Sequence, residues 1–348
     1  MTRPTVRRMG IVVLVLSVLV GLLVQVPVGE RPSLSTLVLA AREWRDCLLK
    51  GEGPSNAFLL NSLIVDGRPA APAFEQWMTP AMTALPSAAD PDIQPVTVAV
   101  LDSGVDASHP ALDAVILPGD DVLNPCGDGR TDPRGHGTAV AGVVIRTAGL
   151  GQHLRILPIR VSFPDGTVPR LAVAAGVLLA VRQGADVINL SLSASSPSFP
   201  ERAAIAYARE QGVIVVAAAG NEPGVAPRYP ATLPGVIAVA AINAQGQVAG
   251  FSATPNPVMV AAPGVDVVVA APGGAFVRSS GTSLAAPAVA GAAARLLAGG
   301  EELGGLTLHD WLIDNGWRAR PVTPLFPVVP DLSPTDDGGW KRPATGPF

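Results

Sequence analysis

The chain reads Val96-Thr97-Val98-Ala99-Val100-Leu101 and then Asp102-Ser103-Gly104, an apolar run that ends in a polar turn. An apolar run without polar alternation is typical of a strand buried on both faces of a parallel sheet. Further strands of this kind are expected at residues 156–161, 186–190, 213–218 and 236–241, and helices at 171–182 and 201–211. This order predicts a doubly wound α/β fold, a mostly parallel sheet flanked by helices, whose sites lie beyond the carboxyl ends of the strands.

Composition limits the class of protein. The 348 residues include 37 glycines and 35 prolines, only 4% are aromatic, and the net charge is −4. The sequence has no basic patch of the kind that binds nucleic acid, so nucleic-acid binding is not expected. The two cysteines, Cys47 and Cys126, lie in no CxxC or Cys/His cluster, and the Asp-rich turn around Asp106 lacks EF-hand spacing, so neither a metal nor a cofactor is expected. One disulfide is the commoner state of two cysteines in an exported protein, but the sequence leaves their pairing open.

The amino-terminal segment carries a targeting signal. Arg3, Arg7 and Arg8 precede an apolar run over residues 9–28, and about 20 apolar residues suffice to cross a bilayer as a helix. We expect an uncleaved signal-anchor that attaches the chain to the membrane, with the basic end cytoplasmic and the remainder outside. A cleaved signal peptide, which would release a secreted protein, is the alternative.

Three polar residues lie where this fold presents its sites. Asp102 ends the first strand, His136 stands between Gly135 and Gly137, and Ser283 precedes the apolar run 288–297, at the expected amino terminus of a helix whose field favours negative charge. Acyl transfer needs such a set, because a hydroxyl becomes nucleophilic when an imidazole takes its proton and a carboxylate orients the imidazole. Each residue alone fits a structural role equally well, as a turn former, a loop histidine or a helix-capping serine.

Two local expectations follow from the neighbours of these residues. Pro287 should be tolerated because it falls in the first helical turn, where its missing N–H is not used. The glycines beside His136 should allow the backbone to pass close to a substrate.

Three segments, Val100–Pro110, Gly135–Gly142 and Gly281–Pro287, resemble the Asp, His and Ser signature blocks of the subtilisin-like serine proteases, in that family's order. The resemblance covers roughly residues 95–297. It implies a serine endopeptidase that acts on polypeptides, with Asp102, His136 and Ser283 as the catalytic triad.

Two further segments are similar to parts of the same family. Ala217–Glu222 resembles its oxyanion-hole segment, which implies that Asn221 donates a hydrogen bond to the oxyanion. Asp186–Ser193 resembles the strand that pairs with the substrate backbone. The substrate-binding residues implied by the two segments are Ser191, Leu192, Ser193, Ala219 and Gly220.

Hydropathy, composition and the resemblance together divide the chain into four parts. Residues 1–29 are a signal-anchor or signal peptide, 30–94 an extension or linker, and 95–300 the catalytic domain. Residues 301–348 are a helix near 306–317 followed by a Pro/Gly-rich tail without a second apolar span. Residues 30–94, with a helical pattern over 34–49, could form a stalk, an embrace of the catalytic domain or a shortened propeptide.

Departures from the family pattern affect specificity. Ser193 and Ala194 stand where the family often has two glycines, so we expect a shallow, apolar pocket for small or aliphatic residues before the scissile bond. Ala111 replaces an Asp common in calcium-binding members, so no calcium site is inferred. An alternative function is a blocked, membrane-tethered scaffold that binds peptides or assembly partners; a protease resembling mycosins ranks lower, because those usually carry a carboxyl-terminal membrane helix.

Overall fold

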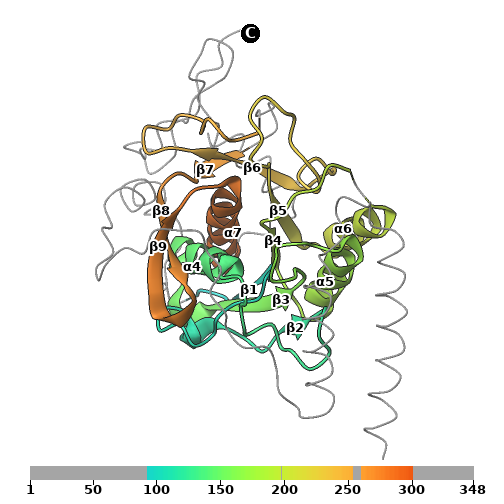
Figure 1. Ribbon diagram of the computed structural model, residues 1–348. Helices are drawn as coiled ribbons and strands as arrows, with labels where there is room; N and C mark the ends of the chain where they lie inside the picture. The colour runs from blue at the N-terminus through green and yellow to red at the C-terminus, as the bar shows by residue number, and fades with distance from the viewer. Residues whose placement is uncertain (1–91, 197, 254–259, 301–348) are drawn as a thin grey trace, which may run out of the picture.

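The computed structural model describes residues 92–196, 198–253 and 260–300, which form a parallel sheet between two layers of helices (Figure 1). The seven-stranded sheet has the order β2-β3-β1-β4-β5-β6-β7, and every neighbouring pair is parallel. Its strands are β1 Val96–Asp102, β2 Asp120–Asp121, β3 Leu154–Arg160, β4 Val187–Leu190, β5 Ile214–Ala218, β6 Ile237–Ile242 and β7 Val260–Pro263. Because the strand order reverses at β1, a crevice is expected beyond the carboxyl end of that strand.

Each face of the sheet has its own hydrophobic core. Helices α4 (His136–Ala148) and α7 (Thr282–Ala298) cover one face, and α5 (Arg170–Arg182) and α6 (Phe199–Glu210) cover the other (Figure 1). Along β1, Val98 and Val100 pack into the first core, whereas Ala99 and Leu101 pack into the second. Alternate residues of a strand point to opposite faces, so burial on both faces accounts for the continuous apolar sequence of β1.

The alanine-rich sequence of α7 allows it to approach α4 closely. An ideal Cβ placed on Gly291 would lie 2.7 Å from the carbonyl oxygen of Val144 and 2.8 Å from Cβ of Thr147. A larger residue would push the helices apart, because packed interiors have no spare space for an added methyl group. The small residues of α7 therefore fix the position of its amino terminus, which carries Ser283.

The predicted doubly wound, mostly parallel sheet is confirmed. The strands and helices predicted within the described residues are all present, with ends that differ by a few residues. Sequence analysis did not predict β2, β7 or the helix α4. It also did not predict the antiparallel hairpin formed by β8 (Val267–Ala271) and β9 (Ala275–Ser279), which packs beside α4 before the chain enters α7.

Several predictions fall outside the described residues: the membrane segment 9–28, the helical pattern 34–49 and the helix 306–317. Within the described ranges, no helix combines the length and apolar character needed to cross a bilayer. Cys126 forms a disulfide bond, and Cys47, the only other cysteine of the sequence, lies outside the described residues.

Candidate active site

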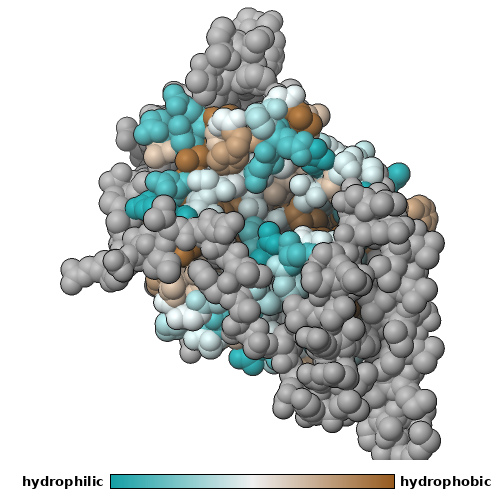
Figure 2. Space-filling model, in the orientation of Figure 1, coloured by the Kyte–Doolittle hydropathy of each residue, from teal (hydrophilic) through white to brown (hydrophobic). Residues whose placement is uncertain are grey.

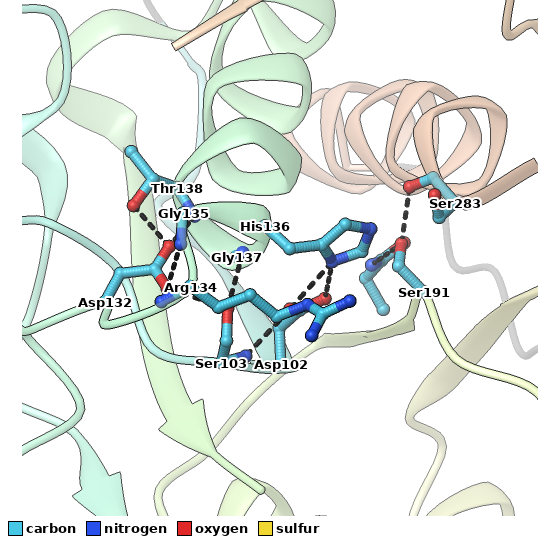
Figure 3. Close-up of polar contacts among 11 residues, drawn as sticks. Asp102, Ser103, Asp132, Arg134, Gly135, His136, Gly137, Thr138, Ser191 and Ser283 are labelled. Atoms are coloured by element: carbon cyan, nitrogen blue, oxygen red, sulfur yellow. Dashed lines mark hydrogen bonds and ion pairs between the residues drawn. The ribbon is translucent and has the colours of Figure 1, made fainter. Parts of the chain in front are cut away.

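Asp102 and His136 form a hydrogen-bonded pair beyond the carboxyl end of β1. Asp102 is the last residue of β1 and His136 is the first of α4. The Nδ1 atom of His136 lies 2.8 Å from Oδ1 and 3.0 Å from Oδ2 of Asp102 (Figure 3). The backbone N–H of Ser103 also donates to Oδ1, at 2.7 Å. Because the carboxylate accepts a hydrogen bond from the Nδ1–H group, the neutral ring carries its proton on Nδ1, and Nε2 is free to accept a proton.

Gly137 brings α4 against the turn that follows β1. An ideal Cβ on Gly137 would lie 2.0 Å from the carbonyl oxygen of Gly104 and 3.1 Å from Cβ of Asp102. The N–H of Gly137 donates to the hydroxyl of Ser103 at 3.0 Å. Our expectation that this glycine makes room for substrate was therefore wrong: the missing side chain makes room for the turn that follows β1.

Asp132, which sequence analysis missed, organises the loop before His136. Its side chain is fully buried. Its Oδ1 accepts hydrogen bonds from the Ser103 hydroxyl at 2.8 Å and from the N–H groups of Arg134 at 3.1 Å and Gly135 at 2.7 Å. Its Oδ2 accepts from the N–H of Thr138 at 2.8 Å and its hydroxyl at 2.6 Å (Figure 3). The sequence signal was an Asp at the first position of a turn, with Pro next and Gly at the fourth.

The surroundings of His136 favour its protonated form. Burial by itself would lower the pKa of His136, but the charge and hydrogen bond of Asp102, together with the charge of Asp132, raise the pKa above the ordinary 6.5. The positive charge of Arg134 opposes this rise. The imidazole is therefore a stronger base than a free histidine, as proton removal from a hydroxyl requires.

Helix α7 begins one residue before Ser283, with Gly281 as its cap, and no side chain caps it. The interpretation of Ser283 as a capping serine was therefore wrong. Pro287 also lies beyond the first turn, contrary to our expectation, and its missing N–H leaves the carbonyl of Ser283 without its helical partner.

Ser191, just after β4, bonds to this free carbonyl. The Ser191 hydroxyl donates to the carbonyl oxygen of Ser283 at 2.7 Å (Figure 3). The side-chain amide of Asn189, which is buried in β4, donates to the Ser191 hydroxyl at 2.9 Å. Because Pro287 leaves the Ser283 carbonyl free, Ser191 can donate to it and connect the backbone of Ser283 to the end of β4.

Thr282 orients the side chain of Asn221. The N–H and the hydroxyl of Thr282 both lie 2.9 Å from Oδ1 of Asn221, and the hydroxyl accepts the N–H of Gly220 at 3.1 Å. Since a backbone N–H can only donate, the bonded atom of Asn221 is its oxygen, and the Nδ2 amide remains available as a donor. An ideal Cβ on Gly281 would lie 2.9 Å from Oγ of Ser283 and 3.4 Å from Nδ2 of Asn221, so both groups approach the same point.

A pocket of about 190 Å³ opens beside the Asp102–His136 pair. It is lined by Asp102, Arg134, His136, Val161, Ser162, Gly166, Val168, Ser191, Leu192 and Ser193. Three of the predicted substrate-binding residues are in this set. Ala219 and Gly220 are not, and Ala219 is buried with its N–H donated to Val239 and its carbonyl bonded to Arg228.

The structure brings Ser283 and His136 to the same site without a direct bond between them. Figure 3 shows the His136 ring between Asp102 and Ser283, and Ser191 both lines the pocket with His136 and bonds to Ser283. No hydrogen bond joins His136 Nε2 to Ser283 Oγ among the described residues. Such bonds are often long without substrate and shorten when it binds.

The chain is similar in sequence to known serine proteinases. The chain is 38% identical over 210 residues to a thermophilic serine proteinase of Bacillus sp. (strain AK1), covering 58% of this chain and 52% of that protein. It is 37% identical over 216 residues to subtilisin amylosacchariticus of Bacillus subtilis subsp. amylosacchariticus, covering 58% and 55%. The chain thus spans about half the length of these relatives.

Two solved structures share the fold. A cold-adapted subtilisin-like serine proteinase has a TM-score of 0.61 at 29% identity, with 68% of this chain and 88% of that chain covered. Sphericase has a TM-score of 0.60 at 28% identity, with 70% and 89% covered. The model of the subtilase family matches residues 94–335, more than half of the sequence. The chain therefore belongs to the subtilase family.

Proposed function

We propose that this chain is a serine endopeptidase that hydrolyses polypeptides through an acyl-enzyme intermediate. Ser283 is the nucleophile, His136 the general base and acid, Asp102 the group that orients His136, and Asn221 the side-chain donor to the oxyanion. The observation that carries the proposal is the Asp102–His136 pair, at 2.8 and 3.0 Å, in the same site as a serine at the start of α7.

In the first half of the proposed reaction, the Ser283 oxygen attacks the scissile carbonyl carbon while Nε2 of His136 takes the hydroxyl proton. The negative charge that develops on the carbonyl oxygen is stabilised by the Nδ2 amide of Asn221 and the N–H of Ser283, near the amino terminus of α7. The carbon–nitrogen bond then breaks, and His136 gives its proton to the leaving amine. In the second half, water attacks the acyl carbon while Nε2 of His136 takes a proton from it. The bond to the Ser283 oxygen then breaks, and His136 returns the proton to that oxygen.

The substrate is proposed to bind as an added strand along Ser191–Ser193. Among the described residues, the backbone groups of Leu192 and Ser193 make no hydrogen bond, although Ala194 exchanges two with Tyr229. An extended peptide could therefore pair with this segment and present its carbonyl to Ser283. The shallow, apolar pocket expected beside Ser193 and Ala194 remains a prediction for the residue before the scissile bond.

Export of the enzyme is proposed from the sequence of residues 1–29. The basic residues before the apolar run 9–28 support a signal-anchor, or a signal peptide if the segment is cleaved. Fractionation of cells that express the full chain, followed by amino-terminal sequencing, distinguishes a membrane-bound from a released product. Recovery of the chain in the cytoplasm would contradict both versions.

Labelling by a fluorophosphonate probe tests the catalytic proposal. The wild-type chain should become labelled and Ser283→Ala should not, while Asn221→Ala should be slower by about 10²- to 10³-fold because it lacks one oxyanion donor. Folded wild-type protein that is neither labelled nor able to cleave peptides would contradict the proposal. That result would instead favour the alternative of a blocked scaffold that binds peptides.

A further inference from the structure

Arg134 places a positive charge in the pocket beside the Asp102–His136 pair. Arg134 lines this pocket together with His136 and Ser191. Among the described residues it forms no hydrogen bond or ion pair through its guanidinium. Figure 3 shows its side chain extending past Ser103 toward Asp102. Five N–H donors in a planar group that lines a pocket indicate a binding function.

The position of the guanidinium is set by packing. An ideal Cβ on Gly166 would lie 2.1 Å from a terminal nitrogen of Arg134, so the guanidinium rests directly on the backbone of Gly166. The N–H of Arg134 is held by Asp132 at 3.1 Å. Both ends of the residue are therefore fixed, which lowers the entropic cost of binding a ligand through this side chain.

Asp102, the acidic residue that lines the pocket, forms no ion pair with Arg134 among the described residues. The carboxylate of Asp102 is already bonded to His136 Nδ1 and to the N–H of Ser103. Asp165, next to Gly166, is exposed and accepts the N–H of Thr167 at 2.8 Å. In Figure 2, hydrophilic residues lie beside hydrophobic ones near the middle of the view, in the region where Figure 1 labels β1 and β4. The other lining groups are hydroxyls, backbone and small apolar side chains.

We propose that Arg134 forms a subsite for an acidic side chain of the substrate, on the acyl side of the scissile bond. A carboxylate matches the guanidinium in charge and in its two-oxygen geometry. Because Ser191–Ser193 forms the opposite wall, a peptide paired with that segment would direct a side chain into this pocket. The inference rests on the proposed function for the direction of the substrate, but the subsite itself can be tested without turnover.

The test measures peptide binding to Ser283→Ala, which cannot consume its ligand. Short peptides with acetylated and amidated ends carry Glu or Gln at one position at a time, so that no terminal carboxylate competes. At one position, the Glu peptide should bind about five- to tenfold more tightly than its Gln counterpart, a modest factor because the pocket is open to solvent. The preference should vanish in Ser283→Ala/Arg134→Gln and should favour Lys in Ser283→Ala/Arg134→Glu.

Ser283→Ala/Arg202→Gln is the matched control, because it removes the same charge from an exposed position on α6 outside the pocket. It should retain the preference for Glu. Equal affinities for Glu and Gln at every position, or a preference that survives Arg134→Gln, would overturn the proposal. Absence of fluorophosphonate labelling in the wild type would contradict the proposed catalysis alone, since the binding comparison uses a variant without the nucleophile.

Discussion

Asp132→Asn tests whether the buried carboxylate before His136 supports the site. The substitution keeps the shape of the side chain but replaces one oxygen by an amide. If that amide takes the place of Oδ2, it meets the N–H of Thr138, a donor that can no longer be satisfied. A buried, unpaired N–H costs about 1–3 kcal/mol. The bonds from Ser103, Arg134 and Gly135 also lose their charge-assisted character.

Removal of the charge offsets part of this loss. Burial raises the pKa of Asp132, so its ionised form is costly in the folded protein, although bonds from Thr138 and Ser103 lower that cost. We therefore expect a net decrease of about 2–4 kcal/mol in the free energy of unfolding. The loop that carries His136 should also lose its position, and kcat/KM should fall by about 10- to 100-fold.

Urea unfolding should be measured in a Ser283→Ala background, which prevents self-digestion, and kcat/KM with Ser283 intact. The control is Asp128→Asn, an exposed residue of the same loop whose side chain accepts one N–H, that of Arg130 at 3.1 Å. It should change the free energy of unfolding by less than about 0.5 kcal/mol. Equal stability and equal kcat/KM for wild type and Asp132→Asn would refute the role given to Asp132.

Further predictions concern proton transfer, the hold on Ser283 and the core. The kcat/KM of the wild type should rise with pH through the raised pKa of His136, above 6.5, because only the neutral ring accepts a proton. Arg134→Gln lacks the charge that lowers this pKa, so the rise should move to higher pH. An unchanged pH profile would contradict the influence of Arg134 on the pKa of His136. Ser191→Ala removes the donor to the Ser283 carbonyl and should lower kcat/KM by about five- to tenfold. Ser196→Ala, a change at an exposed residue, should leave kcat/KM unchanged. Equal losses in steady-state assays would contradict the role given to the Ser191–Ser283 bond. Arg160→Met leaves the carboxylate of Asp121 buried without the guanidinium that lies 3.0 Å away, both side chains being 1% exposed, and should cost about 3–5 kcal/mol in urea unfolding. Arg278→Met removes a 3.5 Å pair with Asp266 in which the side chains are 31% and 71% exposed, and should cost less than about 1 kcal/mol. Similar costs for the two changes would contradict the difference in burial.

Much of the fold could be predicted because the central strands are buried on both faces. The run Val96–Asp102 has no polar face, so it fits only the interior of a layered α/β structure. The hairpin β8–β9 was missed because β9 is half-buried and carries Arg278, a pattern that does not differ from an ordinary loop. The available signals were the buried apolar run of β8 and the turn Pro272-Gly273-Gly274.

The candidate site could be predicted only in part. Asp102, His136, Asn221 and Ser283 stand in segments that resemble family signatures, so short stretches of sequence indicated them. Asp132 and Arg134 were missed because their roles depend on contacts with distant residues: Asp132 with Ser103, and Arg134 with Gly166. The effect of Pro287 was also misjudged, since it depends on the residue at which α7 begins.

If His136 and Ser283 act as one catalytic unit, a double-mutant cycle on peptide hydrolysis is the most direct test. Ser283→Ala and His136→Ala should each lower turnover by on the order of 10⁶-fold, and Ser283→Ala/His136→Ala should lower it no further, because either change removes the same proton-transfer step. Losses that multiply in the double variant, or hydrolysis that persists in Ser283→Ala, would contradict the account.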